Sequence, residues 1–137
     1  QVRDGLRELD YGAWEDRDKD DIRIHHEQDY IRWLTEPAWN PPTDGETAVQ
    51  VASRALTVIS EIESKVEMGN VLVVSHKATI RIILCSLLGI DLGRYRDRID
   101  APAGSVSIVK LAVHGPMLEV LGDRSYMPSH LRERAGT

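Results

Sequence analysis

The stretch that decides the fold is VLVVSHKATIR, residues 71–81. Its first four residues are apolar at every position, which is typical of a strand covered by helices on both faces and so indicates a parallel sheet. The apolar run stops at Ser75 and His76, and a helical pattern continues through residues 78–88 to Gly89. Ligands bind where such a strand gives way to the partial positive charge of a helix start. His76 is therefore a candidate site residue.

The pattern around this stretch alternates helices and strands. Residues 22–34 have the apolar spacing of an amphipathic helix, and a proline-rich loop follows it. Residues 43–46, TDGE, match a capping box ahead of a long helical pattern that extends to Gly69. Residues 105–113 and 117–121 predict a hairpin. The order indicates an α/β fold, a three-layer sandwich with a mostly parallel sheet and an antiparallel edge.

Composition indicates one ordinary globular domain over residues 1–137, with 42% hydrophobic and 28% charged residues. The net charge is −5, and no dense basic patch occurs, so nucleic acid is not an expected partner. No apolar run is long enough to cross a bilayer and no export signal is recognisable, which favours a cytoplasmic protein away from membranes. Cys85, the single cysteine, falls in a helical apolar run where burial is expected.

Two side chains carry the candidate chemistry. His76 could bind or transfer a phosphoryl group, aided by Lys77 and by the hydroxyls of Ser75 and Thr79, or it could only bond a loop carbonyl. Glu8 lies in LRELDYGAWED, just before a glycine turn, where a carboxylate could protonate a leaving alkoxide. An exposed surface carboxylate is the alternative for Glu8.

Four stretches together resemble the successive blocks of the histidine phosphatase superfamily, which includes cofactor-dependent phosphoglycerate mutases and fructose-2,6-bisphosphatase. They are LRELDYGAWED, PPTDGET followed by Arg54, VLVVSHKATIR and the closing GDRSYMPSHL. In that family a phosphoryl group passes to a histidine, and water or a second hydroxyl then attacks the phosphohistidine. The resemblance implies that Glu8 is the proton donor and acceptor, and that His76 is the second active-site histidine.

The same resemblance implies that His76 and the main-chain N–H groups of Lys77 and Ala78 bind the phosphate. Lys77 departs from the family, which more usually has glycine after this histidine. No cofactor and no metal ion are expected. Arg54 and Arg81 are interpreted as ion-pair partners inside the fold, with substrate contact as the alternative.

The family's nucleophile lies in an Arg-His-Gly motif at the end of its first strand, and no such tripeptide occurs in the sequence. His114 precedes a glycine but reads as a hairpin turn residue. We therefore expect the chain to correspond to the C-terminal two-thirds of the family fold, with the N-terminal part missing. A fragment of a longer enzyme and a degenerate relative both remain open.

Without a neighbouring strand, Val71 to Val74 would keep unpaired backbone groups. A homodimer or pairing with the missing N-terminal segment would supply the neighbour. The expected function is a phosphomonoesterase that acts on a small phosphorylated substrate through a phosphohistidine. Residues 1–137 on their own are expected to be inactive. The alternatives are mutase-type phosphoryl transfer and a non-catalytic phosphate-binding or protein-binding relative. A flavodoxin-like nucleotide binder is disfavoured because no glycine-rich loop follows residue 74.

Overall fold

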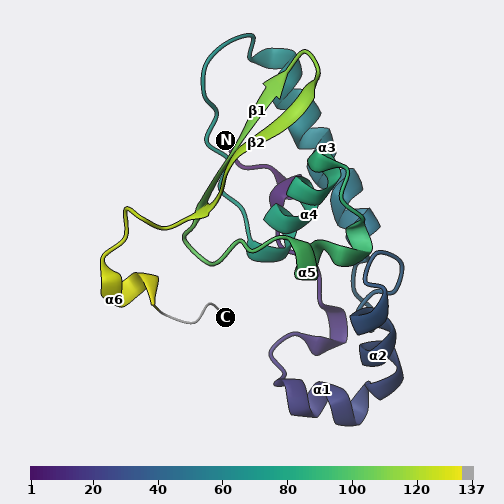
Figure 1. Cartoon of the computed structure of the whole chain (residues 1–137). Helices are drawn as coiled ribbons and strands as arrows, with labels where there is room; N and C mark the ends of the chain where they lie inside the picture. The colour runs from purple at the N-terminus through teal and green to yellow at the C-terminus, as the bar shows by residue number, and fades with distance from the viewer. Residues whose placement is uncertain (134–137) are drawn as a thin grey trace.

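The computed structural model describes residues 1–133, and its elements alternate short helical turns, longer helices and one hairpin (Figure 1). The elements, in order, are η1 (Asp4–Leu6), η2 (Gly12–Trp14), α1 (Lys19–His25), α2 (Glu27–Thr35), α3 (Ala48–Lys65), α4 (Lys77–Leu88), η3 (Leu92–Arg94), α5 (Tyr95–Arg98), β1 (Val106–Ala112), β2 (Gly115–Asp123) and α6 (Ser129–Arg132). In Figure 1, α3 and α4 lie side by side, and α1 and α2 form a separate group below them.

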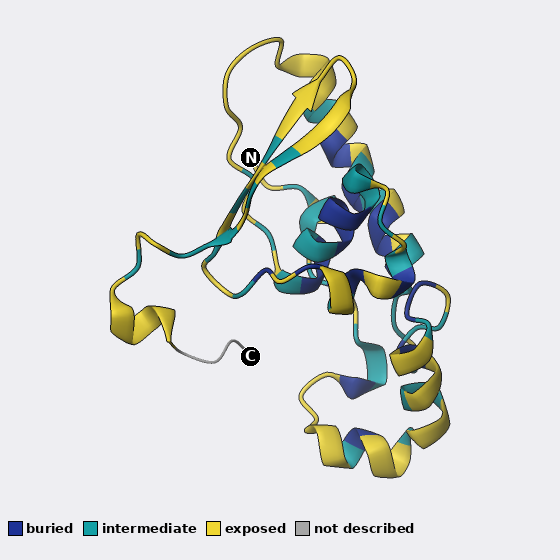
Figure 2. Cartoon of the chain, viewed as in Figure 1, coloured by how far each residue is buried: buried dark blue, intermediate teal, exposed yellow. Residues whose placement is uncertain are grey.

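The core lies between α3 and α4, where the buried residues of the chain concentrate (Figure 2). Small side chains on α3, including Ala48, Ala52 and Ala55, let the apolar face of α4 approach closely. Cys85 is fully buried in this contact, as expected, and burial followed by the nearby Asp91 charge raises the pKa of its thiol to about 11. Within residues 1–133, no helix combines the length and apolar character needed to cross a bilayer.

The start of α3 differs from the sequence-based expectation. The capping box is formed by Thr47 and Gln50: the Thr47 hydroxyl accepts the Gln50 N–H at 3.1 Å, and the Gln50 side chain accepts the Thr47 N–H at 2.8 Å. The predicted box at 43–46 is wrong because the Thr43 hydroxyl is engaged elsewhere, accepting from Trp14 Nε1 and donating to Asp29. The predicted helix of residues 78–88 is confirmed as α4, and it ends at Gly89 in the left-handed region, φ 67°.

The predicted hairpin is confirmed. β1 and β2 pair antiparallel from Val106 opposite Asp123 to Ala112 opposite Gly115, so His114 lies in the connecting turn, as expected. Among the described residues this sheet has two strands only, and the other edge of β1 has no neighbouring strand.

The predicted parallel strand at residues 71–74 is not formed. Residues 70–76 have neither helix nor strand, and Leu72 and Val74 are 83% and 79% exposed. A strand exists only where a neighbour satisfies its backbone groups, and residues 1–133 supply none here. The fold is α/β, but a three-layer sandwich with a parallel sheet is not observed within the described residues.

Candidate functional site

The site begins at the junction between Glu8 and the first turn of α4. The Glu8 carboxylate accepts the backbone N–H of Ala78 at 3.2 Å and that of Thr79 at 3.1 Å. His76 is the N-cap residue of α4 and provides no side-chain cap, so a carboxylate from a distant segment takes that place. Free N–H groups and the helix dipole favour negative charge at this end. The structure therefore brings Glu8 beside His76, as the sequence predicted.

Glu8 is held by Arg54, whose side chain is only 15% exposed. The Arg54 guanidinium donates to the carbonyls of Gly5, Arg7 and Glu8 at 2.8, 2.9 and 3.0 Å. It also forms an ion pair with Glu46 at 2.9 Å. Burial alone would raise the pKa of Glu46, but the hydrogen bonds from Arg54 and the Asp10 N–H, together with the Arg54 and Arg7 charges, bring it below the ordinary value. Arg54 is a structural ion-pair partner, in agreement with the first of its two interpretations.

The hydroxyls of Ser75 and Thr79 are used differently from the sequence-based expectation. Ser75 Oγ donates to the Leu6 carbonyl at 2.7 Å, and Thr79 Oγ1 donates to the Arg7 carbonyl at 2.7 Å. Thr79 is fully buried. Both hydroxyls therefore fasten the segment that carries Glu8 to the start of α4, and neither is directed at an open phosphate position.

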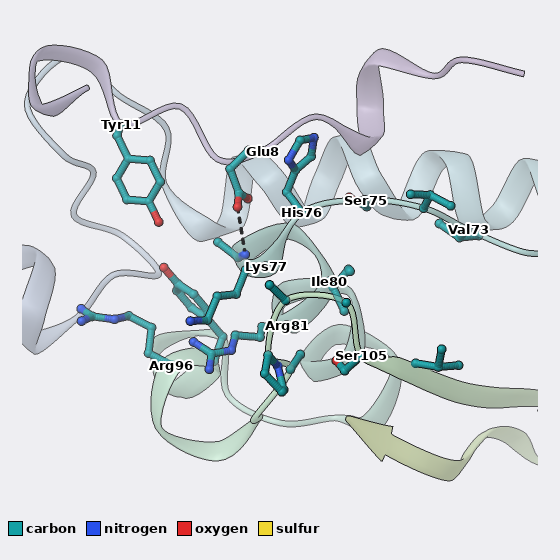
Figure 3. Close-up of a pocket in the computed structure, with 18 of the residues that line it drawn as sticks. Glu8, Tyr11, Val73, Ser75, His76, Lys77, Ile80, Arg81, Arg96 and Ser105 are labelled. Carbon is teal, nitrogen blue, oxygen red and sulfur yellow. Dashed lines mark hydrogen bonds between the residues drawn. The ribbon is translucent and has the colours of Figure 1, made fainter. Parts of the chain in front are cut away.

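His76 is exposed, while Ala78 is buried and its N–H is already bonded to Glu8. A phosphate that used the Ala78 N–H would have to share it with the Glu8 carboxylate or displace that carboxylate. Lys77 lies at the first helical position, and its side chain runs along the cavity toward the side where Arg81 lies (Figure 3). The phosphate-binding roles of His76, Lys77 and Ala78 stay predictions.

These residues open onto one cavity of about 780 Å³ (Figure 3). One side is formed by residues 72–78, and the opposite side by residues 101–106. Tyr11, Trp33 and Tyr95 also line the cavity; sequence inspection read Trp33 as a wall or core residue and did not single out the two tyrosines. Tyr11 is three residues after Glu8, and the turn at Gly12, φ 54°, admits no side chain because a Cβ would run into the backbone of residues 43–45.

The two tyrosines of the cavity wall, Tyr11 and Tyr95, have raised pKa values. Burial, followed by the negative charge of Glu8, raises the pKa of Tyr11, while Arg96 and Arg81 oppose the shift. Burial also raises the pKa of Tyr95. Both phenols therefore remain protonated at neutral pH and can donate hydrogen bonds into the cavity.

The five histidines of the chain are all described, and His76 is the one that lines the cavity. His25 is near Asp21 at 3.3 Å, and His26 bonds Thr43 at 3.0 Å. Within residues 1–133, no group of three His, Cys, Asp or Glu side chains is arranged to hold a metal ion.

Comparison with known proteins connects this geometry to a family. The chain is 29% identical over 92 residues to phosphoserine phosphatase 1 of Hydrogenobacter thermophilus, covering 67% of the chain and 44% of that protein. It is 25% identical over 126 residues to adenosylcobalamin/alpha-ribazole phosphatase of Escherichia coli, covering 91% and 61%. The structure of YhfR from Bacillus stearothermophilus superposes with a TM-score of 0.79 at 25% identity, covering 87% and 59%.

The chain thus spans less than half of the first of these relatives and about three-fifths of the other two. Two of the three are named as phosphatases. The family description "Histidine phosphatase superfamily (branch 1)" matches residues 1–124. Because this match covers residues 1–124 and the fold superposes on that of YhfR, the chain belongs to the histidine phosphatase superfamily.

Proposed function

We propose that residues 1–137 form the part of a histidine-type phosphomonoesterase that contains the proton donor, and that the enzyme acts on a small phosphorylated substrate. In this proposal His76 binds the oxygens of the transferring phosphoryl group, and Glu8 protonates the leaving oxygen. The observation that carries the proposal is the Glu8 carboxylate bonded to the Ala78 and Thr79 N–H groups, two and three residues after His76. Phosphatase relatives support the reaction class.

The bonds around Glu8 fix the carboxyl group in one orientation. Glu8 Oε1 accepts two backbone N–H groups, from Leu9 at 2.9 Å and from Thr79 at 3.1 Å, and Thr79 Oγ1 lies 3.2 Å away with its one proton donated to the Arg7 carbonyl. Glu8 Oε2 has one, the Ala78 N–H, which leaves it the freer oxygen for a substrate proton. A carboxyl held in one orientation beside the cavity can deliver a proton without first being reoriented.

The nucleophilic histidine, in this proposal, comes from polypeptide outside residues 1–137. A strand from that polypeptide would fit between residues 72–76 and the free edge of β1, on opposite sides of the cavity. It would pair with Val71 to Val74, cover their exposed side chains and complete the three-layer sheet. The greater length of the relatives agrees with such an addition. Without it, residues 1–137 lack a nucleophile and are inactive.

The test compares two substrates in the longer protein that supplies the nucleophile. An alkyl phosphate such as ethyl phosphate has a poor leaving group and needs protonation, whereas p-nitrophenolate leaves with little help. We expect Glu8→Gln to slow hydrolysis of ethyl phosphate by about 10²-fold to 10⁴-fold and to slow that of p-nitrophenyl phosphate less. His76→Ala should slow both substrates strongly, because it acts on the shared phosphoryl group.

Phosphate release measured without added metal separates hydrolysis from transfer to a second hydroxyl. His130→Ala is the matched control, since His130 lies on α6 away from the cavity. Full activity of His76→Ala, or equal losses for the two substrates in Glu8→Gln, would contradict the assigned roles. Turnover by residues 1–137 alone would show that the nucleophile is already present.

A further inference from the structure

Positive side chains gather in the cavity beyond Glu8. Lys19, Lys77, Arg81 and Arg96 line it, and Glu8 is the single carboxylate among its described lining residues. The chain as a whole has a net charge of −5, so this local excess of positive charge runs against the overall composition. A cavity lined in this way attracts anions.

Arg81 is poorly neutralised by the protein. Its side chain is 16% exposed, and its Nε is buried without a hydrogen-bond partner. Its ion-pair partner, Asp100, is 3.5 Å away and 87% exposed. A buried donor without an acceptor is costly, and one in a native structure calls for a water, an ion or a ligand. The alternative interpretation of Arg81, contact with substrate, therefore gains weight over a purely structural ion pair.

Tyr95 presents a second unpartnered donor to the same cavity. Its side chain is 1% exposed, and its hydroxyl has no hydrogen-bond partner. Both Arg81 and Arg96 are near enough to act electrostatically on this phenol. The wall of the cavity thus carries two buried donors without an acceptor, Arg81 Nε and the Tyr95 hydroxyl.

The Arg96 side chain is held in place by stacking on a ring, and no carboxylate of the described residues pairs with its charge. Its guanidinium carbon is 3.9 Å from the centroid of the Trp33 ring, a cation–π arrangement that fixes the plane of the group. In the described part of the chain, Arg96 forms no ion pair with a carboxylate, whereas Arg94, two residues earlier, is 3.9 Å from Asp97. Stacking leaves the N–H edges of Arg96 available to a ligand.

The position of Glu8 divides the cavity into two parts. In Figure 3 the His76 ring lies on one side of the Glu8 carboxylate, and the Arg81 and Arg96 side chains lie on the other. A proton donor sits at the bridging oxygen of a phosphoester, so the phosphoryl group and the leaving group extend to opposite sides of it. The leaving group would then reach toward Arg81 and Arg96.

We propose that Arg81, Arg96 and Tyr95 form a subsite for a second anionic group, carried by the leaving alcohol of the phosphomonoester. The inference rests on the proposed function, because Glu8 must mark the bridging oxygen. A carboxylate or a second phosphate has the required chemistry, since the planar guanidinium offers paired N–H groups to two oxygens. Uncharged alcohols would leave the Arg81 and Tyr95 donors unpaired.

The test measures binding by titration calorimetry at low salt, using the full chain and matched ligands. Phosphoglycolate and ethyl phosphate differ by one carboxylate in place of a methyl group, and ethylene glycol bisphosphate provides the second-phosphate arm. We expect at least one of the two doubly anionic ligands to bind about tenfold tighter than ethyl phosphate, and the tighter of them to identify the second group. Arg81→Gln and Arg96→Gln should each bring that ratio toward one.

Arg98→Gln is the matched control, because Arg98 is exposed on the same helix, α5, and does not line the cavity. Arg81→Lys keeps the charge without the fork and should retain part of the preference, which separates binding from misfolding. Circular dichroism checks the fold of each variant. Equal affinity of the unaltered chain for all three ligands would overturn the subsite.

A different binding result would assign Arg81 to the transferring phosphoryl group and not to the leaving group. If inorganic phosphate bound as tightly as phosphoglycolate and Arg81→Gln weakened both equally, Arg81 would hold the transferring phosphoryl group, and the proposal would be wrong. Because these are binding measurements, they can fail while the Glu8 and His76 activities stand. They can also succeed if those catalytic roles are contradicted.

Discussion

The two halves of VLVVSHKATIR have opposite structural states. Residues 75–79 are tied by side chains to a segment about seventy positions earlier, through Ser75 to Leu6, Thr79 to Arg7 and the Glu8 carboxylate to α4. Residues 71–74 have no hydrogen bond to any described part of the chain, and most of their apolar surface is exposed. The junction is complete within residues 1–133, whereas the preceding segment lacks the neighbour that would make it a strand.

The difference shows what each kind of structure requires. A carboxylate cap and buried hydroxyl bonds need only two segments, and both are present here. A strand inside a sheet needs backbone partners on both edges, so it depends on polypeptide that lies beside it in space. Residues 75–79 can therefore hold the Glu8 carboxylate in place although residues 71–74 pair with no strand among the described residues.

The largest expected effect comes from breaking the junction at Arg54. Arg54→Met removes the donor to three carbonyls and leaves Glu46 partly buried with only Arg7 as an ion-pair partner. We expect the free energy of unfolding to fall by about 3 kcal/mol, measured by urea denaturation.

Arg7→Met is the matched control for Arg54→Met. Arg7 pairs with the same Glu46 carboxylate at 2.8 Å, but its side chain is 54% exposed. Its loss should cost at most about 1 kcal/mol. Equal losses for the two variants would mean that Arg54 acts only through its charge on Glu46 and does not hold the Glu8 segment.

A smaller effect is expected from Thr79→Val, which preserves shape and removes one hydroxyl. The Arg7 carbonyl would lose a donor but keep its bond from Arg54, so we expect a loss of about 1 to 2 kcal/mol. Thr57→Val is the control, because the Thr57 hydroxyl bonds the Ser53 carbonyl on an exposed face of α3. If both variants were equally stable, Thr79 would not contribute to the junction.

The sequence predicted what depends on neighbouring residues along the chain. The helix from 78 to 88, its end at Gly89 and the hairpin follow from local periodicity and turn residues, and all three are observed. The start of α3 was placed four residues early because TDGE and TAVQ both satisfy the capping pattern. Only the packing of Trp14 and Asp29 against Thr43 shows which of them is used.

The site was predictable where it lies at the junction between the predicted strand, residues 71–74, and the helix that follows it. That reasoning, with the family resemblance, singled out Glu8 and His76, and the structure places both on the wall of one cavity. It did not point to Arg96 or Tyr95, which also line the cavity, because they come from the short helix α5 and have no periodic or motif signal. Residues 71–74 carry the apolar pattern of a buried strand, but the predicted strand is not formed here, because pairing depends on a second segment that periodicity does not specify.

The smallest expected effect concerns Leu72, which is already 83% exposed. Leu72→Lys should change the stability of the 137-residue chain by no more than about 0.5 kcal/mol, because the side chain loses no burial. Hydrogen exchange should likewise show fast exchange at residues 71–74 and strong protection at residues 82–85 of α4.

In the longer protein, where a strand is proposed to cover Leu72, Leu72→Lys should cost several-fold more stability and the amides of residues 71–74 should become protected. Protection in a monomeric 137-residue chain, checked by sedimentation, would instead mean that these residues pair within the chain itself, and protection only in a dimer would identify a second copy as the neighbour.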